Sequence, residues 1–152
     1  MKKLEFKKEI NAPAHKVYEK MLGLHNKTDY EYWTKSFNPT SSYEGSWQLN
    51  SKILFVGVDH NGKKAGMVSK VVEHDPAKRV AVQHYGYLDG DNEITTGEQV
   101  EKWAGGLEIY NFMENNGRTT LLVELDSSDE FIDYFNQTYP KALDRLKELC
   151  EK

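Results

Sequence analysis

The chain has little of what builds disulfide frameworks, membrane spans or basic binding surfaces. Its single cysteine, Cys150, excludes an internal disulfide and favours a reducing compartment such as the cytoplasm. No apolar run approaches the ~20 residues of a membrane-spanning helix, and no apolar segment follows the N-terminal lysines as in a secretory signal. Basic residues gather only in pairs, and the formal net charge is −4. We therefore expect no membrane insertion and no nucleic-acid partner.

Motifs for metal or cofactor chemistry are missing as well. None of the five histidines stands at HExxH or Cys-His spacing, and one cysteine is too few for the common structural zinc sites. The pair Gly105-Gly106 is too short for a phosphate loop and does not begin a helix, so a bend or bulge is the better interpretation. We expect no metal site and no cofactor.

The most informative segment is the stretch from Leu4 to Leu22. Residues 4–10 alternate between apolar and polar side chains and predict a strand. Pro13 suits the start of a helix, because its fixed φ matches and its missing N–H would be unpaired there. Val17, Tyr18, Met21 and Leu22 then form one apolar stripe at helical spacing. A strand that feeds a short helix therefore opens the chain.

The middle of the chain predicts a series of antiparallel hairpins. A second short helix carries Trp33 and Phe37, and strands follow over residues 43–48, 51–58, 64–73 and 79–87. Residues 88–97 are polar and rich in turn formers, so a mobile loop is expected there. Two further strands are expected over residues 103–112 and 119–125.

The register of the hairpin over residues 103–125 decides which side chains face the interior. A two-residue turn at Asn116-Gly117 puts Tyr110 on the same face as Val123, whereas a three-residue loop puts Ile109 there. We favour the two-residue turn. Glu108 then shares the face of Tyr110.

The last segment predicts a long amphipathic helix. It opens near Ser128-Asp129, and apolar residues recur at three- and four-residue spacing from Ile132 to Cys150. Pro140 should kink or interrupt it. Strands grouped between helices indicate an α+β fold, with a curved antiparallel sheet around the last helix and two short helices after the first strand. At 152 residues we expect a single domain over 1–152.

Several motifs resemble the START/SRPBCC superfamily, also called helix-grip or birch-pollen-allergen-like. The similarity is narrower to bacterial homologues of the activator of heat-shock-protein-90 ATPase. The matching pieces are Ile10-Asn11-Ala12-Pro13, Trp33, Glu44-Gly45-Ser46-Trp47, Gly66-Met67-Val68 and the segment 139–147. The resemblance implies a ligand cavity between sheet and helix, and it also implies a possible protein partner. These are scaffold motifs, and the fold does not decide the function.

Two titratable residues are weak candidates for acid–base chemistry. His84 lies in a predicted strand and would need a carboxylate partner that the sequence does not identify. Glu108 faces the cavity in the favoured register, and carboxyl groups in such positions concentrate at functional sites. A structural or surface role is the commoner outcome for either residue.

Aromatic residues come from almost every predicted element, and they suit an apolar, ring-containing or lipid-like ligand. The alternative is that they only fill the core. We expect the ligand contacts to come from Trp33, Phe37, Trp47, Phe55, Tyr85, Trp103, Tyr110, Phe131 and Tyr134.

Three hypotheses for the function follow. The first is a non-catalytic domain that holds a small apolar ligand. The second is an enzyme of the same fold, cyclase- or hydrolase-like, and the third is a protein-interaction module. The charge and the lack of a long exposed apolar stripe predict a monomer or a weak dimer.

Overall fold

The computed structural model describes all 152 residues. Its elements in chain order are β1 (Lys2–Ile10), α1 (Ala14–Leu22), α2 (Lys27–Thr34), β2 (Ser42–Gly45), β3 (Lys52–Val58), β4 (Lys64–Asp75), β5 (Arg79–Asp89), β6 (Asn92–Ile94), α3 (Glu98–Glu101), β7 (Gly106–Asn115), β8 (Arg118–Ser127), the 3₁₀ turn η1 (Asp129–Phe131) and α4 (Ile132–Cys150).

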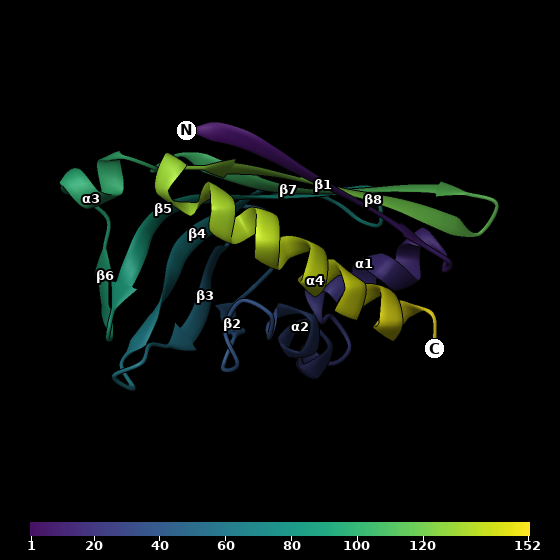
Figure 1. Ribbon diagram of the computed structural model, residues 1–152, viewed down its shortest axis with the longest axis horizontal. Coiled ribbons are helices and arrows are strands. Elements are labelled where there is room, and N and C mark those ends of the chain that lie inside the picture. Colours follow the sequence, from purple (N-terminus) through teal and green to yellow (C-terminus); the bar gives the residue numbers. More distant parts are fainter.

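One eight-stranded antiparallel sheet forms the body of the molecule. Its strand order is β1-β8-β7-β5-β4-β3-β2, and β6 pairs with β5 beside this path. The sheet curves around α4, which runs along its concave side, and α1 and α2 lie beyond the C-terminal part of α4 (Figure 1). The expected helix-grip α+β fold is confirmed.

The start of the chain forms as its sequence predicts. Pro13 stands immediately before α1 in an extended conformation, and Gly23 ends the helix in the left-handed conformation at φ 65°. In that position Gly23 lets its backbone N–H reach the carbonyl of Lys20. The indole Nε1 of Trp33 donates to the Met21 carbonyl at 2.8 Å, which ties α2 to the end of α1.

The β7–β8 hairpin has the favoured register. Asn116 and Gly117 take positive φ values of 55° and 78°, and Tyr110 pairs with Val123. The face that carries Tyr110 is buried against the helices, which confirms the prediction of the two-residue turn. This register also directs Glu108 to the inner face.

The core is densest around the C-terminal half of α4. Leu143, Leu146 and Cys150 are 0–1% exposed there and pack with the inner side chains of the sheet and of α1. The helix passes through Pro140 without interruption. Of the two expected outcomes, a kink or an interruption, the interruption is wrong.

Three further local expectations need correction. Residues 88–97 are not one loop, because β5 continues to Asp89 and β6 turns back to pair with it. The short helix α3 follows, although its four residues give no periodic signal. Trp103 lies in the turn after α3, so the strand expected to begin there starts at Gly106.

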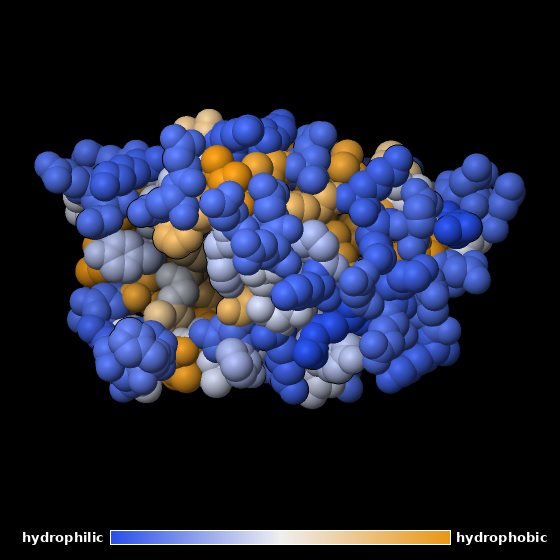
Figure 2. All heavy atoms as spheres, viewed as in Figure 1, coloured by the Kyte–Doolittle hydropathy of each residue, from blue (hydrophilic) through white to orange (hydrophobic).

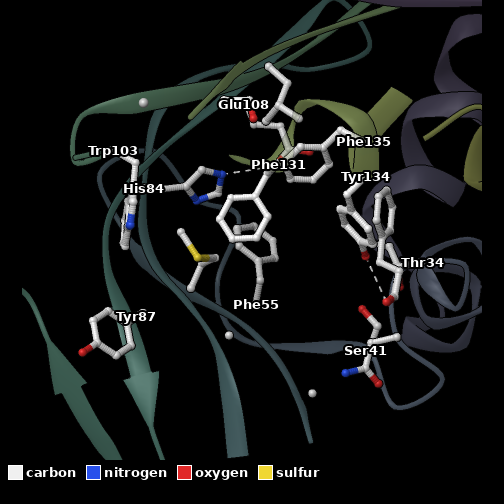
Figure 3. Close-up of a pocket in the computed structure, with 18 of the residues that line it drawn as sticks. Thr34, Ser41, Phe55, His84, Tyr87, Trp103, Glu108, Phe131, Tyr134 and Phe135 are labelled. Atoms are coloured by element: carbon white, nitrogen blue, oxygen red, sulfur yellow. Dashed lines mark hydrogen bonds and ion pairs between the residues drawn. The ribbon is translucent and has the colours of Figure 1, made fainter. Parts of the chain in front are cut away.

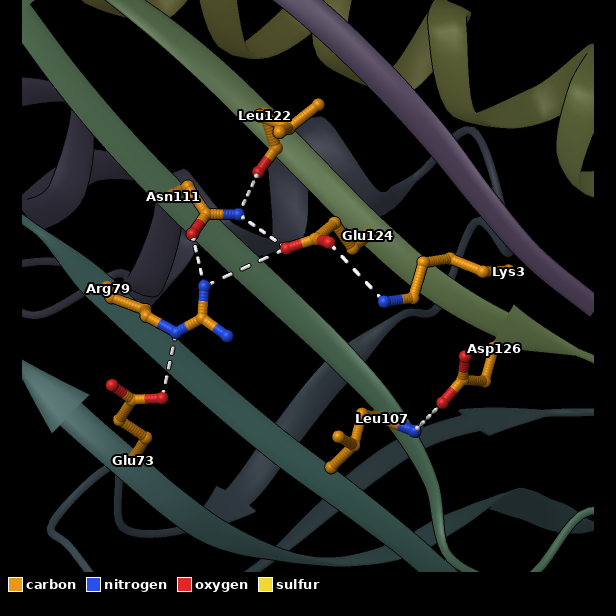
Figure 4. A network of polar contacts seen from close by, with 8 residues as sticks. All are labelled: Lys3, Glu73, Arg79, Leu107, Asn111, Leu122, Glu124 and Asp126. Carbon is orange, nitrogen blue, oxygen red and sulfur yellow. Dashed lines mark hydrogen bonds and ion pairs between the residues drawn. The ribbon is translucent and has the colours of Figure 1, made fainter.

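The outer face of the sheet carries a chain of charged and amide groups (Figure 4). Glu124 accepts from Asn111 at 3.0 Å and lies 3.5 Å from the Lys3 ammonium and 3.7 Å from the Arg79 guanidinium. The hydrogen bond from Asn111, assisted by the two cations, lowers the pKa of the Glu124 carboxyl. The negative charge of Glu124 is therefore balanced by neighbouring positive charges and a hydrogen bond.

Candidate functional site

A pocket of about 780 Å³ lies between the N-terminal half of α4 and strands β3, β4, β5 and β7. Figure 2 shows it as a hollow beside the beginning of α4, with hydrophobic atoms in its walls. The strand that α4 contacts most broadly is β1, on the other side of the sheet's concavity. The sheet and the first turns of the helix therefore stand apart where the pocket lies.

Eleven of the 28 residues that line the pocket are aromatic. The rings come from α2 and the residues after it, from β3, β5 and β7, from the turn after α3, and from η1 and α4. They are Tyr30, Trp33, Phe37, Phe55, Tyr87, Trp103, Tyr110, Phe131, Tyr134, Phe135 and Tyr139. Figure 3 shows Trp103 and Tyr87 on one side and Tyr134 on the other, with Phe55 and Phe131 between them.

Small residues make the space on the β3–β4 side. Gly57, Ala65 and Gly66 line the pocket there, where larger side chains would occupy it. Gly66 has a φ of 142°, and a Cβ built on it would lie 1.8 Å from the Phe55 carbonyl oxygen. A glycine is therefore required at this close approach of the two strands.

A polar network lies inside the aromatic wall. The Nε2 of His84 is 3.2 Å from Oε1 of Glu108, and the Tyr139 hydroxyl donates to Oε2 of the same carboxylate. On the other side of the imidazole, Ser69 Oγ lies 2.6 Å from Nδ1. The side chains of His84 and Glu108 are 12% and 16% exposed, so both are held in place yet reach the pocket.

These contacts define the state of the imidazole. A carboxylate only accepts hydrogen bonds, so Nε2 carries a proton, and in the neutral ring the Ser69 hydroxyl donates to Nδ1. Ser69 is 0% exposed and does not line the pocket. It orients His84 and is not an accessible nucleophile, although serine, histidine and glutamate stand in a row.

The tyrosines around Glu108 are neutral donors. Burial, and after it the charge of Glu108, raises the pKa of Tyr30, Tyr110 and Tyr139 well above the ordinary value of 10.0. Their hydroxyls therefore stay protonated over the physiological range. The site can hold a polar group beside an apolar body, and it offers His84 and Glu108 as a pair that can exchange a proton.

The structure brings most of the predicted residues to one place. Seven of the nine expected ligand contacts lie on the pocket wall, together with both acid–base candidates: Trp33, Phe37, Phe55, Trp103, Tyr110, Phe131, Tyr134, His84 and Glu108.

Trp47 and Tyr85, the other two expected contacts, do not line the pocket. Trp47 is 4% exposed and packs behind Phe55, with ring centroids 5.6 Å apart, because β2 ends at Gly45 and the chain turns inward. Tyr85 is the extra residue of a bulge, since Val68 pairs with Gly86 and Ser69 with His84. The bulge shifts the alternation by one residue, and Tyr87 faces the pocket in its place.

The predicted set leaves out four rings of the wall, Tyr30, Tyr87, Phe135 and Tyr139, and also Ser69, which contacts His84 from behind the wall. Tyr139 stands on the apolar stripe of the last helix, one turn from Phe135, and this position was the available signal. The contacts of Ser69 depend on strand pairing across a bulge and leave no local pattern.

Other kinds of site are not indicated. No group of three or more histidine, cysteine, aspartate or glutamate side chains is placed to hold a metal ion. No helix has both the length and the apolar character needed to cross a bilayer.

The comparisons with known proteins place the fold only. No protein-family model and no curated protein sequence matches the chain. Solved structures do match. The Aha1 dimer of Colwellia psychrerythraea is 21% identical with a TM-score of 0.70, and the match covers 99% of this chain and 97% of that one.

Two further bacterial proteins show the same likeness. One from Nitrosomonas europaea is 15% identical with a TM-score of 0.70, covering 97% of this chain and 92% of that one. One from Mesorhizobium loti is 11% identical with the same TM-score, covering 97% and 96%. At these identities the likeness supports a helix-grip fold and carries no function with it.

Proposed function

We propose that this chain binds a small apolar, ring-containing or lipid-like molecule in the pocket beside α4. The observation that carries the proposal is the cavity of about 780 Å³ with aromatic walls and a polar pair inside. Ligand sites usually begin at ~300 Å³ and combine apolar walls with a few polar groups that fix orientation. Had the aromatic residues interlocked without such a cavity, protein interaction would have been the better hypothesis.

The exposed rings at the mouth support the same proposal. Phe131 and Tyr134 are 46% and 42% exposed, although the chain buries comparable side chains elsewhere. A bound apolar molecule would cover them and remove their surface from water. That gain is ~25 cal/mol per Å² of apolar surface.

The test uses N-phenyl-1-naphthylamine, a neutral dye at pH 7 that becomes fluorescent in apolar sites. We expect saturable binding at one dye per chain. Phe131→Lys should weaken binding ~10-fold or more, because an aromatic contact is lost and a charge stands at the mouth. Phe131 is a better choice than Phe55, which is half-buried against Tyr30 and Trp47 at the base of the pocket.

Met113→Lys is the matched control. Met113 is 49% exposed on β7, outside the pocket, so the same charge is added at similar exposure. The proposal fails if the unmodified chain shows no saturable binding, or if both variants lose it equally.

The contact between His84 and Glu108 favours a second candidate, an enzyme of the same fold that uses these two residues as acid and base. Under this alternative, His84→Ala and Glu108→Gln abolish conversion of a compound that the unmodified chain consumes from a metabolite extract. Mass spectrometry of the extract measures the conversion. If the chain is only a carrier, no compound is consumed and both variants still bind the dye.

The assembly state is also a proposal. The Colwellia protein is described as a dimer; we propose a monomer or weak dimer for this chain, in the cytoplasm. Sedimentation equilibrium at low micromolar concentration tests it, and a stable dimer with a large apolar interface would contradict it.

A further inference from the structure

The charges around the pocket are of one sign. The lining includes three acidic residues, Glu108, Asp126 and Glu130, and no lysine or arginine. The Asp126 carboxylate accepts the Leu107 backbone N–H at 3.0 Å at the edge of the pocket, and Glu130 is exposed at the mouth. Glu108 is the carboxylate that faces the interior.

Four of the nine hydroxyl groups in the wall donate hydrogen bonds within the protein. Thr34 donates to the Tyr30 carbonyl at 2.7 Å, and Tyr134 donates to the Phe37 carbonyl at 3.1 Å. Ser127 donates to its neighbour's carbonyl, and Tyr139 donates to Glu108. An anionic head group at Glu108 would therefore meet a carboxylate, and these four hydroxyls would not be free to donate to it.

The Glu108 carboxylate, in contrast, still has free capacity to accept hydrogen bonds. Glu108 accepts hydrogen bonds from His84 and Tyr139, the Tyr110 hydroxyl is a third neighbour, and a carboxylate with about four lone-pair sites can accept one more. The aromatic faces nearby add to this, because a cation is attracted to the electron-rich face of a ring. Phe55 lies with its centroid 6.0 Å from that of His84, so an aromatic ring stands beside the polar pair.

Glu124 shows that the lack of a cation at Glu108 is specific to the pocket. The two residues lie on neighbouring strands, and their side chains are 17% and 16% exposed. Glu124 has Lys3 and Arg79 beside it, whereas His84 is the only group beside Glu108 that can carry a positive charge.

From this contrast we infer that the pocket selects apolar amines, whose ammonium group would lie at Glu108, and discriminates against carboxylates of the same shape. The inference rests on the proposed function, because it names the chemical class of that pocket's ligand. A ligand of the same shape with a neutral, hydrogen-bond-donating head group should bind more weakly than the amine and more tightly than the carboxylate.

The test uses three probes with one ring system, 2-(2-naphthyl)ethylamine, 2-(2-naphthyl)ethanol and 2-naphthylacetate, titrated by calorimetry at pH 7. We expect the amine to bind about tenfold or more tighter than the acetate, with the alcohol between them. Glu108→Gln should remove most of this difference and leave the affinity for the alcohol within about threefold. Glu124→Gln, a carboxylate of equal exposure on the outer face, should change none of the three affinities.

The failures are distinguishable. If the alcohol binds but the acetate binds as tightly as the amine, the inference is wrong and the ligand pocket stands. A preference for the amine that survives in Glu108→Gln, or disappears in Glu124→Gln, also overturns it. If none of the three probes binds, the proposed function fails and the inference falls with it.

Discussion

The two halves of α4 are built from similar residues and are used in opposite ways. From Tyr139 to Cys150 the inner side of the helix is buried against α1, α2 and β1. Near the start of the helix, Tyr134 and Phe135 line the pocket instead, and Tyr134 remains 42% exposed. One helix therefore supplies both the centre of the core and one wall of the pocket.

The difference separates stability from binding along the chain. Close packing around the C-terminal half of α4 stabilises the fold through burial of apolar surface and dispersion contacts. The N-terminal half lacks part of this stabilisation, because the pocket leaves it loosely packed. Substitutions in the first half should therefore change binding more than stability, and those in the second half should do the reverse. Three predictions test this contrast.

The largest expected effect concerns the thiol of Cys150. Burial raises the pKa of Cys150 from 9.0 to about 12, so the reactive thiolate is about a thousandfold rarer at pH 8 than in a free cysteine. Labelling with a thiol reagent should be slow in the native protein and fast in denaturant. Rapid labelling of the native protein at pH 8 would show that the C-terminal half of α4 opens readily. That result would contradict the described difference between the two halves of the helix.

The next effect concerns packing. Leu146 is 0% exposed, and Leu146→Ala should lower the free energy of unfolding by ~2–5 kcal/mol, because it leaves a cavity. Leu149→Ala is the control, since Leu149 is only half-buried on the same turn of the helix and should cost clearly less. Urea denaturation measures both. A loss below ~0.5 kcal/mol at Leu146 would contradict the assignment of the core.

The smallest effect compares two hydroxyls of the same helix. Tyr139→Phe removes a donor from the partly buried Glu108 carboxylate and should destabilise by ~1–3 kcal/mol. Tyr134→Phe removes a donor from the Phe37 carbonyl at the open end, where water can replace it, and should cost ~0.5 kcal/mol or less. Equal costs for the two, measured by urea denaturation, would mean that the ends of α4 do not differ as described.

Local chemistry in the sequence predicted much of the fold and part of the site. The Asn116-Gly117 turn decides which residues of β7 face inward, and so the position of Glu108 follows from two turn residues. The strand–helix start at Pro13 and the long stripe of α4 were equally visible. These features depend on neighbours within a few positions of one another.

The remainder depends on pairing between distant strands. The bulge at Tyr85 arises from a shift in the register between β4 and β5. The sequence of β5 alone contains no pattern that predicts it. The same shift places Ser69 against His84, while Glu108 reaches His84 only through the β5–β7 pairing. Long-range register therefore assembled the polar network, and the sequence could offer His84 and Glu108 only as separate candidates.

The pairing of β1 with β8 has a consequence for synthesis on the ribosome. Ile10 pairs with Thr119, so β1 has no strand partner until about a hundred further residues have been made, on the order of ten seconds at usual rates of translation. Lys3, Glu5, Lys7 and Glu9 alternate with its apolar residues, and Lys8 stands at an inward-facing position, where it pairs with Asp144 in the finished fold. Charges of this kind oppose pairing between nascent chains. We therefore expect the charges of β1 to disfavour aggregation of the growing polypeptide until β8 has been made.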